Sequence, residues 1–322
     1  MAVLVTGGAG YIGSHMACSL VDAGEAVVIL DNLSTGMRSL IPQAAQFVQG
    51  NVGDAALVER IIGENQVDAI VHMAGSIVVP ESISNPLLYY ANNVSETLHL
   101  IAAAVHAGVR NFIFSSSAAV YGPAQDGPVT EDALLAPINP YGRSKMIAEW
   151  MLGDTTQAHD FDHMILRYFN VAGADPRGRT GQSHPMATHL IKRACLAALG
   201  RIPCVDIFGT DFPTRDGTGV RDYIHVSDLI EAHVLALKSL RAGEGSATLN
   251  CGYGRASRCV RLSPQLRGQA AREFEHVSSL VGLAIARSWL QIRAKLLLGW
   301  GGVQNMTIST TSYAARMPGN AS

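Results

Sequence analysis

The chain has 322 residues, of which 48% are hydrophobic and 16% charged, so it can bury a large core and does not have the composition of a disordered tail. Its 24 Lys and Arg against 26 Asp and Glu give a formal net charge of −2, which argues against a basic nucleic-acid-binding surface. The five cysteines show neither the paired spacing of a metal site nor the density of a disulfide-rich secreted domain. The cysteine spacing therefore predicts no metal site. Because no apolar run is long enough to span a membrane and no basic leader precedes the first strand-like segment, we expect a cytoplasmic protein.

The first half of the chain alternates short apolar runs with segments of helical spacing. Runs of Val, Ile, Leu and Phe bounded by Gly or polar residues predict strands at Ala2–Thr6, Ala26–Asp31, Ala69–Ala74, Asn111–Ser116 and His163–Tyr168. Helical length and spacing predict helices at Ile12–Ala23, Ala55–Glu64, Tyr90–Ala107 and Tyr141–Thr155. We therefore expect the α/β class, with a doubly wound parallel sheet (a Rossmann fold), right-handed crossovers and helices on both faces.

The second half changes in composition twice. Residues 173–219 are rich in Gly, Pro and Thr around one expected helix, Ala187–Leu199, which favours a smaller substrate lobe over an independent domain. From residue 257 onward the charge is +6, whereas the first 256 residues carry −8. We expect a cofactor domain over 1–172, a C-terminal substrate lobe over 173–255 and an atypical tail over 256–322.

A glycine-rich loop follows the first expected strand and opens the first expected helix. Glycines at 7, 10 and 13 allow a tight turn, close approach of the backbone to a pyrophosphate, and close packing of helix on strand. A glycine triplet alone is weak evidence, but Asp31 at the end of the second strand strengthens it. A carboxylate there accepts hydrogen bonds from a ribose 2′-hydroxyl and repels a 2′-phosphate, so NAD is preferred to NADP.

Tyr141 and Lys145 form a second candidate site. Four residues apart on a helix, they share a face, and a nearby ammonium favours the phenolate and lowers the pKa of the tyrosine, giving a general base near neutral pH. Such a pair is usually a surface pair, but its place in the fifth βα unit after a dinucleotide fingerprint favours function. Ser117 ends the preceding strand, where its hydroxyl can bond a substrate oxygen or merely cap the strand.

Six segments together resemble the extended short-chain dehydrogenase/reductase family, and most closely its UDP-glucose 4-epimerases. They are Thr6–Gly13, Asp31–Ser34, Ser115–Gly122, Tyr141–Lys145, Leu166–Asn170 and Gly217–Val226. The resemblance runs from Met1 to about Arg255. It implies interconversion of UDP-galactose and UDP-glucose through a 4-keto intermediate with hydride transfer to tightly bound NAD, in galactose or exopolysaccharide sugar-nucleotide metabolism. It also implies a homodimer formed through the helices Tyr90–Ala107 and Tyr141–Thr155, with no nucleic-acid or membrane partner.

The resemblance also assigns roles to individual residues. The implied catalytic residues are Tyr141, Lys145 and Ser117. The implied cofactor-binding residues are Gly7, Gly10, Tyr11, Ile12, Gly13, Asp31, Asn32, Ser34, Thr35, Gly36, Asn51, Val52, Met73, Ala74, Gly75, Asn92, Ser115, Tyr141, Lys145 and Phe169. The implied substrate-binding residues are Ser117, Tyr141, Asn170, His189, Leu190, Ile207, Phe208 and Arg221. Arginine suits a role on the substrate phosphates through bidentate, permanently charged recognition.

Two positions depart from the family pattern. Asn51 stands where the family usually has an Asp against adenine, and an amide can still hydrogen-bond there. The lysine that usually follows the Ala-Gly pair is missing, because Ser76 and Ile77 follow Gly75. One contact with a cofactor phosphate is therefore not expected in this chain.

In the implied mechanism, Tyr141 as phenolate takes the proton of the sugar 4-hydroxyl while hydride passes from carbon 4 to NAD. Ser117 bridges the hydroxyl, and Lys145 holds the ribose and keeps the phenol acidic. The 4-keto sugar then rotates about its diphosphate link and receives the hydride on its opposite face.

Three alternatives stay open. A 4-epimerase of UDP-GlcNAc or of a UDP-uronate uses the same residues. A nucleotide-sugar 4,6-dehydratase is disfavoured, because Ala118 and Ala119 occupy the places of its usual Asp-Glu pair and cannot transfer protons. A non-catalytic NAD-sensing protein has no reason to keep both Tyr141 and Lys145.

After Arg255 the family pattern stops, and the Arg-Arg-x-Gly-Asp segment that normally closes over the uridine diphosphate is not found. Residues 256–259 can be encoded by GCT-TCT-CGG-TGC, and with one preceding G the same letters encode the family continuation Gly-Phe-Ser-Val. A suitable back-translation of residues 302–312, read in the same offset, gives a sequence close to the C-terminal pattern of the family. We therefore expect an out-of-frame translation over 256–322. The alternative is a divergent tail with an amphipathic helix over Ser279–Lys295.

Overall fold

A seven-stranded sheet forms the centre of the computed structural model, which describes residues 1–123, 128–184, 189–205, 220–254 and 257–258. The strand order is β10-β6-β5-β4-β1-β2-β3, and all neighbouring strands are parallel. The strands are β1 (Ala2–Thr6), β2 (Ala26–Asp31), β3 (Gln46–Gln49), β4 (Val67–His72), β5 (Asn111–Ser117), β6 (Asp162–Tyr168) and β10 (Ala247–Cys251). The predicted parallel sheet is confirmed.

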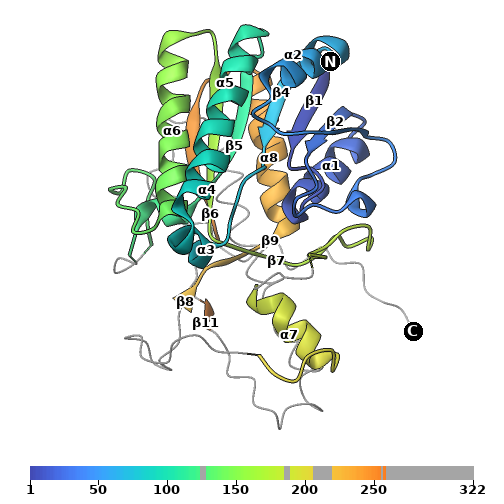
Figure 1. The fold of residues 1–322 in the computed structure, drawn as a ribbon, viewed down its shortest axis with the longest axis vertical. Helices are drawn as coiled ribbons and strands as arrows, with labels where there is room; N and C mark the ends of the chain where they lie inside the picture. Colours follow the sequence, from blue (N-terminus) through green and yellow to red (C-terminus); the bar gives the residue numbers. More distant parts are fainter. Residues whose placement is uncertain (124–127, 185–188, 206–219, 255–256, 259–322) are drawn as a thin grey trace, which may run out of the picture.

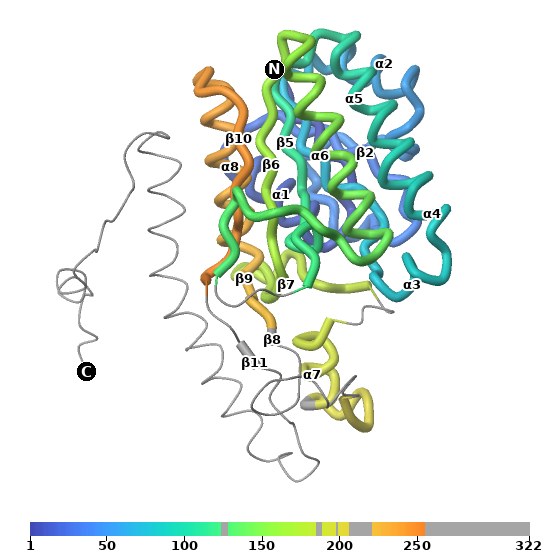
Figure 2. Tube along the Cα trace, turned by 90° about the vertical axis from the view of Figure 1, so that its left-hand side faces the viewer, coloured from blue at the N-terminus to red at the C-terminus, as the bar shows by residue number. Residues whose placement is uncertain are grey.

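Helices cover both faces of this sheet (Figures 1 and 2). One face carries α1 (Tyr11–Asp22) and α8 (Val226–Arg241), and the other carries α2 (Ala55–Asn65), α5 (Glu96–His106) and α6 (Pro140–Ala158). Because successive side chains of a strand point to opposite faces, each inner strand contributes side chains to two separate hydrophobic cores. The predicted double winding is thus confirmed.

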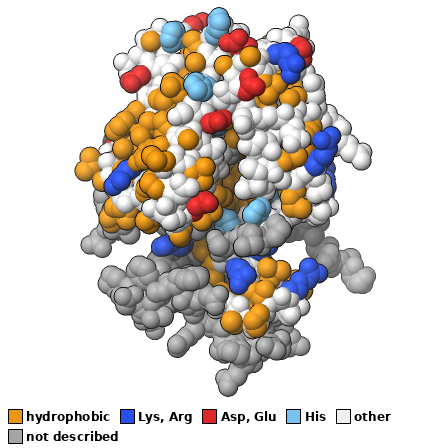
Figure 3. Space-filling view, viewed as in Figure 1, with side chains coloured by type: hydrophobic (Ala, Val, Ile, Leu, Met, Phe, Trp, Pro, Cys, Tyr) orange, Lys and Arg blue, Asp and Glu red, His pale blue; other side chains and the backbone are white. Residues whose placement is uncertain are grey.

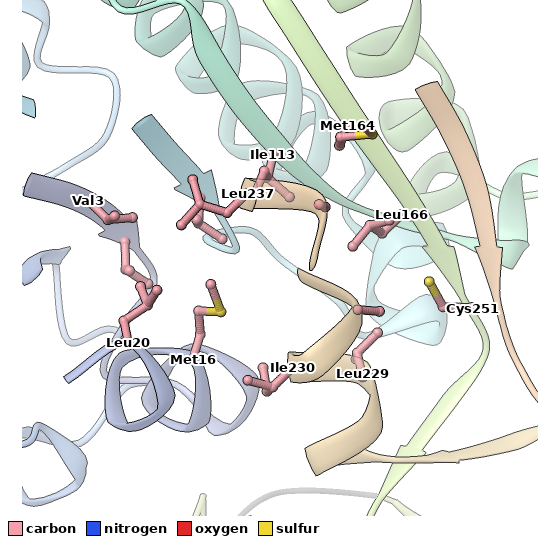
Figure 4. Close-up of a cluster of buried hydrophobic side chains, with 14 of the residues drawn as sticks. Val3, Met16, Leu20, Ile113, Met164, Leu166, Leu229, Ile230, Leu237 and Cys251 are labelled. Atoms are coloured by element: carbon pink, nitrogen blue, oxygen red, sulfur yellow. The ribbon is translucent and has the colours of Figure 1, made fainter. Parts of the chain in front are cut away.

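The two cores follow from this alternation. Figure 4 shows the core beneath α1 and α8, where Val3 of β1 lies with Met16, Leu20, Leu229 and Leu237. Leu4, the next residue of β1, belongs to the core beneath α2, α5 and α6. Burying apolar side chains on both faces explains why the inner strands are continuous Val, Ile and Leu runs.

The expected helix Tyr90–Ala107 is divided in the structure. It consists of the end of α4 (Pro86–Tyr90), the π-helical segment η2 (Ala91–Ser95) and α5. The wider π turn contains two adjacent asparagines, and such turns are frequent at functional sites. Periodicity predicts a helix here but does not reveal the change of winding.

The remaining described elements are short, apart from α7, and all of them lie outside the main sheet. They are η1 (Arg38–Leu40), α3 (Val79–Ser84), η3 (Ala118–Tyr121), β7 (Asn170–Ala172), α7 (Leu190–Ala198), β8 (Val220–Arg221), β9 (Tyr223–His225) and β11 (Ser257–Arg258). β7 pairs with β9, and β8 pairs with β11. The expected helix Ala187–Leu199 corresponds to α7.

The predicted substrate lobe over 173–255 is not separate from the sheet throughout. α8 packs on β5 and β6, and β10 pairs with β6 as the last strand of the sheet. Among the described residues of this lobe, α7, β8 and β9 lie beyond the end of the sheet (Figure 1). The predicted out-of-frame tail lies outside the described residues, except for Ser257 and Arg258. None of the described helices combines the length and the apolar character needed to cross a bilayer.

Three buried histidines lie along the sheet as neutral side chains. Burial lowers the pKa of His72 to about 3 and those of His163 and His233 to about 4. His72 bridges Thr6 Oγ1, at 2.7 Å, and Thr97 Oγ1, at 3.0 Å. Neutral imidazoles satisfy such contacts, whereas a buried imidazolium would be desolvated.

Stability should therefore fall as the pH drops from about 6.5 to 5. An unfolded histidine takes up a proton near its ordinary pKa of about 6.5, and these folded histidines do not, so acid favours the unfolded chain by up to about 1.4 kcal/mol per pH unit for each. The free energy of unfolding in urea, measured at pH 7.5 and 5.0, checks this. His72→Asn should reduce the difference between the two values. An unfolding free energy that is equal or higher at pH 5.0 would contradict the prediction.

Candidate active site

The first turn of α6 carries the candidate catalytic pair. Pro140 occupies its start, and the Asn139 side chain caps the helix by accepting a 2.8 Å bond from the Gly142 amide. A Cβ at Gly142 would lie 2.5 Å from the carbonyl oxygen of Ala119, so only glycine allows this approach between α6 and η3. The approach brings Tyr141 to the end of β5.

Tyr141 is buried, with 9% of its surface exposed. Its phenol forms a hydrogen bond with Ser117, and its ring packs edge-on against Tyr89. Burial raises the pKa of Tyr141, and the bond to Ser117 opposes that rise. The groups of the protein itself therefore leave the phenol protonated at neutral pH.

The prediction that Lys145 acidifies Tyr141 stays a prediction, and the structure shows which groups the ammonium contacts. The Lys145 Nζ donates a 2.9 Å bond to the carbonyl oxygen of Ser115 and lies 4.7 Å from the centre of the Phe114 ring. The ammonium is thus directed toward β5. Burial lowers the pKa of Lys145 itself to about 8, and the Glu149 carboxylate counteracts this.

Ser117 lies where sequence reasoning placed it, at the carboxyl end of β5. Its Oγ accepts a 3.2 Å bond from the Ala119 amide and starts η3. It therefore both caps this turn and contacts Tyr141. The neighbouring Ser115 Oγ points to the opposite face, where it bonds His233 Nε2 at 2.9 Å.

The glycine loop after β1 has the geometry of a phosphate cradle. Gly7 has a φ of +70°, and a Cβ on it would lie 2.7 Å from the Ala74 nitrogen. A Cβ on Gly13 would lie 2.1 Å from the Gly7 oxygen. Gly10 precedes α1 without a side-chain cap, so no side chain occupies the position where an anion binds the first amides of the helix.

Asp31 is fixed beside this loop at the end of β2. Its carboxylate accepts bonds from the amides of Ala9, at 2.9 Å, and Leu33, at 2.8 Å. The cradle and this acid, on adjacent parallel strands, fit the pyrophosphate and ribose of a dinucleotide. The residues present therefore fit NAD.

The expected adenine-side residues cluster after β2 and β3. Asn32 Nδ2 donates a 2.8 Å bond to Asn51 Oδ1, so the structure brings these two amides together. Ser34 and Thr35 are exposed, and Val52 is buried. A Cβ on Gly36 would lie 2.9 Å from an Asp31 oxygen, which keeps this turn close to the acid.

The loop after β4 carries the expected nicotinamide-side residues. Gly75 lies close to Lys145, since a Cβ on it would be 3.8 Å from Nζ. Asn92 donates a 2.8 Å bond to Ser76 Oγ. Sequence reasoning missed Asn93, which bonds both the amide and the carbonyl of Ser76 and also Ser144 on α6. The Asn-Asn pair in an apolar helix was the available signal, but it does not show which amide is buried.

The expected substrate residues lie on elements beyond the carboxyl edge of the sheet. Asn170 is in β7, and its backbone N–H donates a 3.0 Å bond to the Asp222 carbonyl oxygen. Arg221 is exposed in β8. Phe169 lies against Gly252, at 3.3 Å from the position of a Cβ there. His189 and Leu190 begin α7. Ile207 and Phe208 lie outside the described residues.

Comparison with known proteins agrees with this geometry. The family model described as the NAD dependent epimerase/dehydratase family matches residues 3–252. A UDP-glucose 4-epimerase of Azospirillum brasilense is 58% identical over 270 residues, which are 83% of this chain and 78% of that protein. A UDP-glucose 4-epimerase of Lactobacillus helveticus is 46% identical over 252 residues, 78% of this chain and 76% of that protein.

Solved structures are also similar. The UDP-glucose 4-epimerase of Brucella ovis in complex with NAD has a TM-score of 0.77 and 44% identity, covering 83% of this chain and 81% of that one. The enzyme of Bifidobacterium longum in complex with NAD+ and UDP has a TM-score of 0.74 and 36% identity, with 80% of each chain covered. The cradle, the acid after β2 and the Tyr-Lys pair thus occur on a fold and sequence shared with these enzymes, and the chain belongs to the NAD-dependent epimerase/dehydratase family.

Proposed function

We propose that the chain is a UDP-glucose 4-epimerase, which interconverts UDP-glucose and UDP-galactose with tightly bound NAD. The carrying observation is the buried phenol of Tyr141, bonded to Ser117 and one helical turn from Lys145, at the same sheet edge as the glycine cradle. Relatives that share the family and bear this activity in their names support the assignment.

NAD would accept a hydride from carbon 4 of the sugar and return it. In our proposal Tyr141 takes the proton of the 4-hydroxyl, and Ser117 orients that oxygen through its bond to the phenol. Lys145 would hold the ribose and supply positive charge beside the reacting groups. Because burial raises the pKa of Tyr141, its deprotonation depends on positive charge that is present when the substrate binds.

A 4,6-dehydratase is the weaker candidate. Elimination needs an additional acid–base pair next to the reacting sugar. Ala118 and Ala119 follow Ser117 directly in η3 and present only methyl groups there.

A homodimer and a cytoplasmic location are part of the proposal. Leu98 on α5 and Trp150 on α6 are 48% and 56% exposed, and hydrophobic side chains gather on the side of the molecule that carries these helices (Figure 3). A shallow pocket between the two helices is lined by Leu98, Ile101, Ala102, Val105, His106, Thr155 and His159. An exposed apolar face of this kind suits a second copy of the chain. The buried free thiol of Cys18 suits a reducing compartment.

Tyr141→Phe should lower the rate of UDP-galactose conversion by about 10²- to 10⁴-fold, because the substitution removes only the oxygen that accepts the proton. A coupled assay of UDP-glucose formation with purified protein checks this. Tyr90→Phe, on the same side of the sheet but in α4, is the matched control and should retain the wild-type rate. A Tyr141→Phe rate within a factor of three of wild type would rule out the proposed role.

We also propose that residues 256–322 are an out-of-frame product, as the charge change and the two offset matches indicate. A chain with the reading frame restored from residue 256 should be more stable and should bind uridine diphosphate more tightly, because it regains the closing segment. Isothermal calorimetry of both chains measures this, and intact mass together with resequencing of the 3′ end of the gene establishes which tail is made. Equal affinities would contradict the proposal.

A further inference from the structure

Glu149 extends the catalytic face of α6 by one turn. Tyr141, Lys145 and Glu149 are spaced by four residues, and all three are buried. The Glu149 carboxylate is held by Arg167 of β6, whose Nε donates bonds of 3.0 and 3.2 Å and whose Nη2 donates a 2.6 Å bond. Ser116 Oγ also donates to this carboxylate. Residues of two strands, Ser116 of β5 and Arg167 of β6, therefore hold the Glu149 carboxylate in place.

The buried Arg167–Glu149 ion pair carries a large desolvation penalty. Burying two charges removes their hydration, and well-packed apolar residues stabilise a fold as well or better. Arg167 and Glu149 are 6% and 5% exposed, so both are removed from water. A role in the site beside them accounts for the arrangement better than stability does.

The neighbour that needs this charge is Lys145. Its ammonium contacts only a carbonyl oxygen and an aromatic ring among the described contacts, and burial lowers its pKa to about 8. Glu149 is the group that raises that pKa. At pH 7 a lysine with a pKa of about 8 is charged in about ten molecules for each neutral one. A further fall of about one unit in this pKa would leave the lysine neutral in about half of the molecules.

The other titratable groups around Lys145 do not supply negative charge. His72 of β4 is neutral, with its pKa lowered by burial to about 3. Burial raises the pKa values of Tyr141 and of Tyr168 on β6, so both phenols stay protonated. Arg167 is a cation tied to Glu149. Among these described groups the anion beside Lys145 is Glu149.

The same carboxylate also ties down the strand that the catalytic pair contacts. Ser116 lies between Ser115, whose carbonyl accepts the Lys145 bond, and Ser117, which bonds Tyr141. Arg167 Nη1 donates further bonds to Tyr121 Oη, at 2.8 Å, and to the Glu131 carbonyl, at 3.2 Å. The network thus connects β6, α6 and the end of β5.

We propose that Glu149, oriented by Arg167 and Ser116, is a positioning residue of the active site: it keeps Lys145 protonated near neutral pH and holds the end of β5 against the catalytic pair. The link to catalysis rests on the proposed epimerase function. The effect of Glu149 on the charge state of Lys145 does not depend on that function and can be measured separately.

The chain offers a direct measurement because it has only four lysines, at positions 145, 192, 238 and 295. Carbon-13 labelling of the lysine side chains gives one NMR signal for each, and Lys145→Met identifies the signal of interest. In Glu149→Gln the titration midpoint of Lys145 should fall by on the order of one pH unit. Asp154→Asn, which removes an exposed charge from the same helix, is the matched control and should leave the midpoint unchanged. A Glu149→Gln midpoint within about 0.2 units of wild type would overturn the proposal.

Glu149→Gln leaves Arg167 buried without its carboxylate and can weaken folding for that reason alone. The double variant Glu149→Gln with Arg167→Met removes both charges and keeps the volume filled. The proposal expects a lowered Lys145 midpoint in the double variant as well, by less than in Glu149→Gln, because loss of the Arg167 cation opposes the fall. A folded double variant with a wild-type midpoint would show that the pair is merely structural.

The pH profile of kcat provides the second readout. Lys145 must be charged to act, so a lowered pKa should move the high-pH limb of the profile to lower pH in both variants. A shifted midpoint with an unmoved limb would overturn the catalytic part of the proposal. If the wild-type chain converts no UDP-galactose, the epimerase proposal fails, while the NMR midpoints still decide the role of Glu149.

Discussion

The close approach between the first turn of α6 and the end of β5 is the contact on which the site depends. It requires glycine at 142, a helix that starts at Asn139-Pro140, and a strand that ends in three serines. A larger side chain at Gly142 would push the helix away from Ala119 and would separate Tyr141 from Ser117. The parallel sheet supplies the rest, because its strands all end at one edge, where the glycine loop, Asp31 and the loop after β4 also lie.

Burial sets the electrostatics at this edge. It raises the pKa of Tyr141 and lowers that of Lys145, so each group is driven toward its neutral form. Proton transfer from a sugar needs the opposite, a phenolate beside an ammonium. Within the chain, the Glu149 carboxylate one turn along α6, held by Arg167, is the charge that favours the ammonium.

Much of the fold follows from local sequence, because buried parallel strands need continuous apolar runs and the glycine loop needs specific backbone freedom. β1, β2, β5 and β6 were predicted within one residue at each end for this reason. β3 and β10 were not predicted, since four- and five-residue strands with polar side chains carry little pattern. The π turn at Ala91–Ser95 was not predicted either, because apolar periodicity does not distinguish π from α winding, and the contact of Asn93 with Ser144 is visible only in the structure.

The placement of the candidate residues was predictable, whereas the contacts of the lysine were not. Motif spacing placed Tyr141, Lys145 and Ser117 together, but it does not show which groups the ammonium contacts. The direction of the ammonium is set by the Ser115 carbonyl and the Phe114 ring, which no spacing rule contains. Glu149 was overlooked for a related reason: a helical Glu usually faces water, and only the tertiary structure shows Arg167 beside it.

The most direct test of the central claim is a crystal structure of the protein with NAD and UDP-glucose. The account predicts Tyr141 Oη within about 2.6–3.2 Å of the sugar 4-hydroxyl, with carbon 4 facing the nicotinamide ring. A sugar bound with its 4-hydroxyl out of reach of that phenol, on the far side of Ser117, would contradict it.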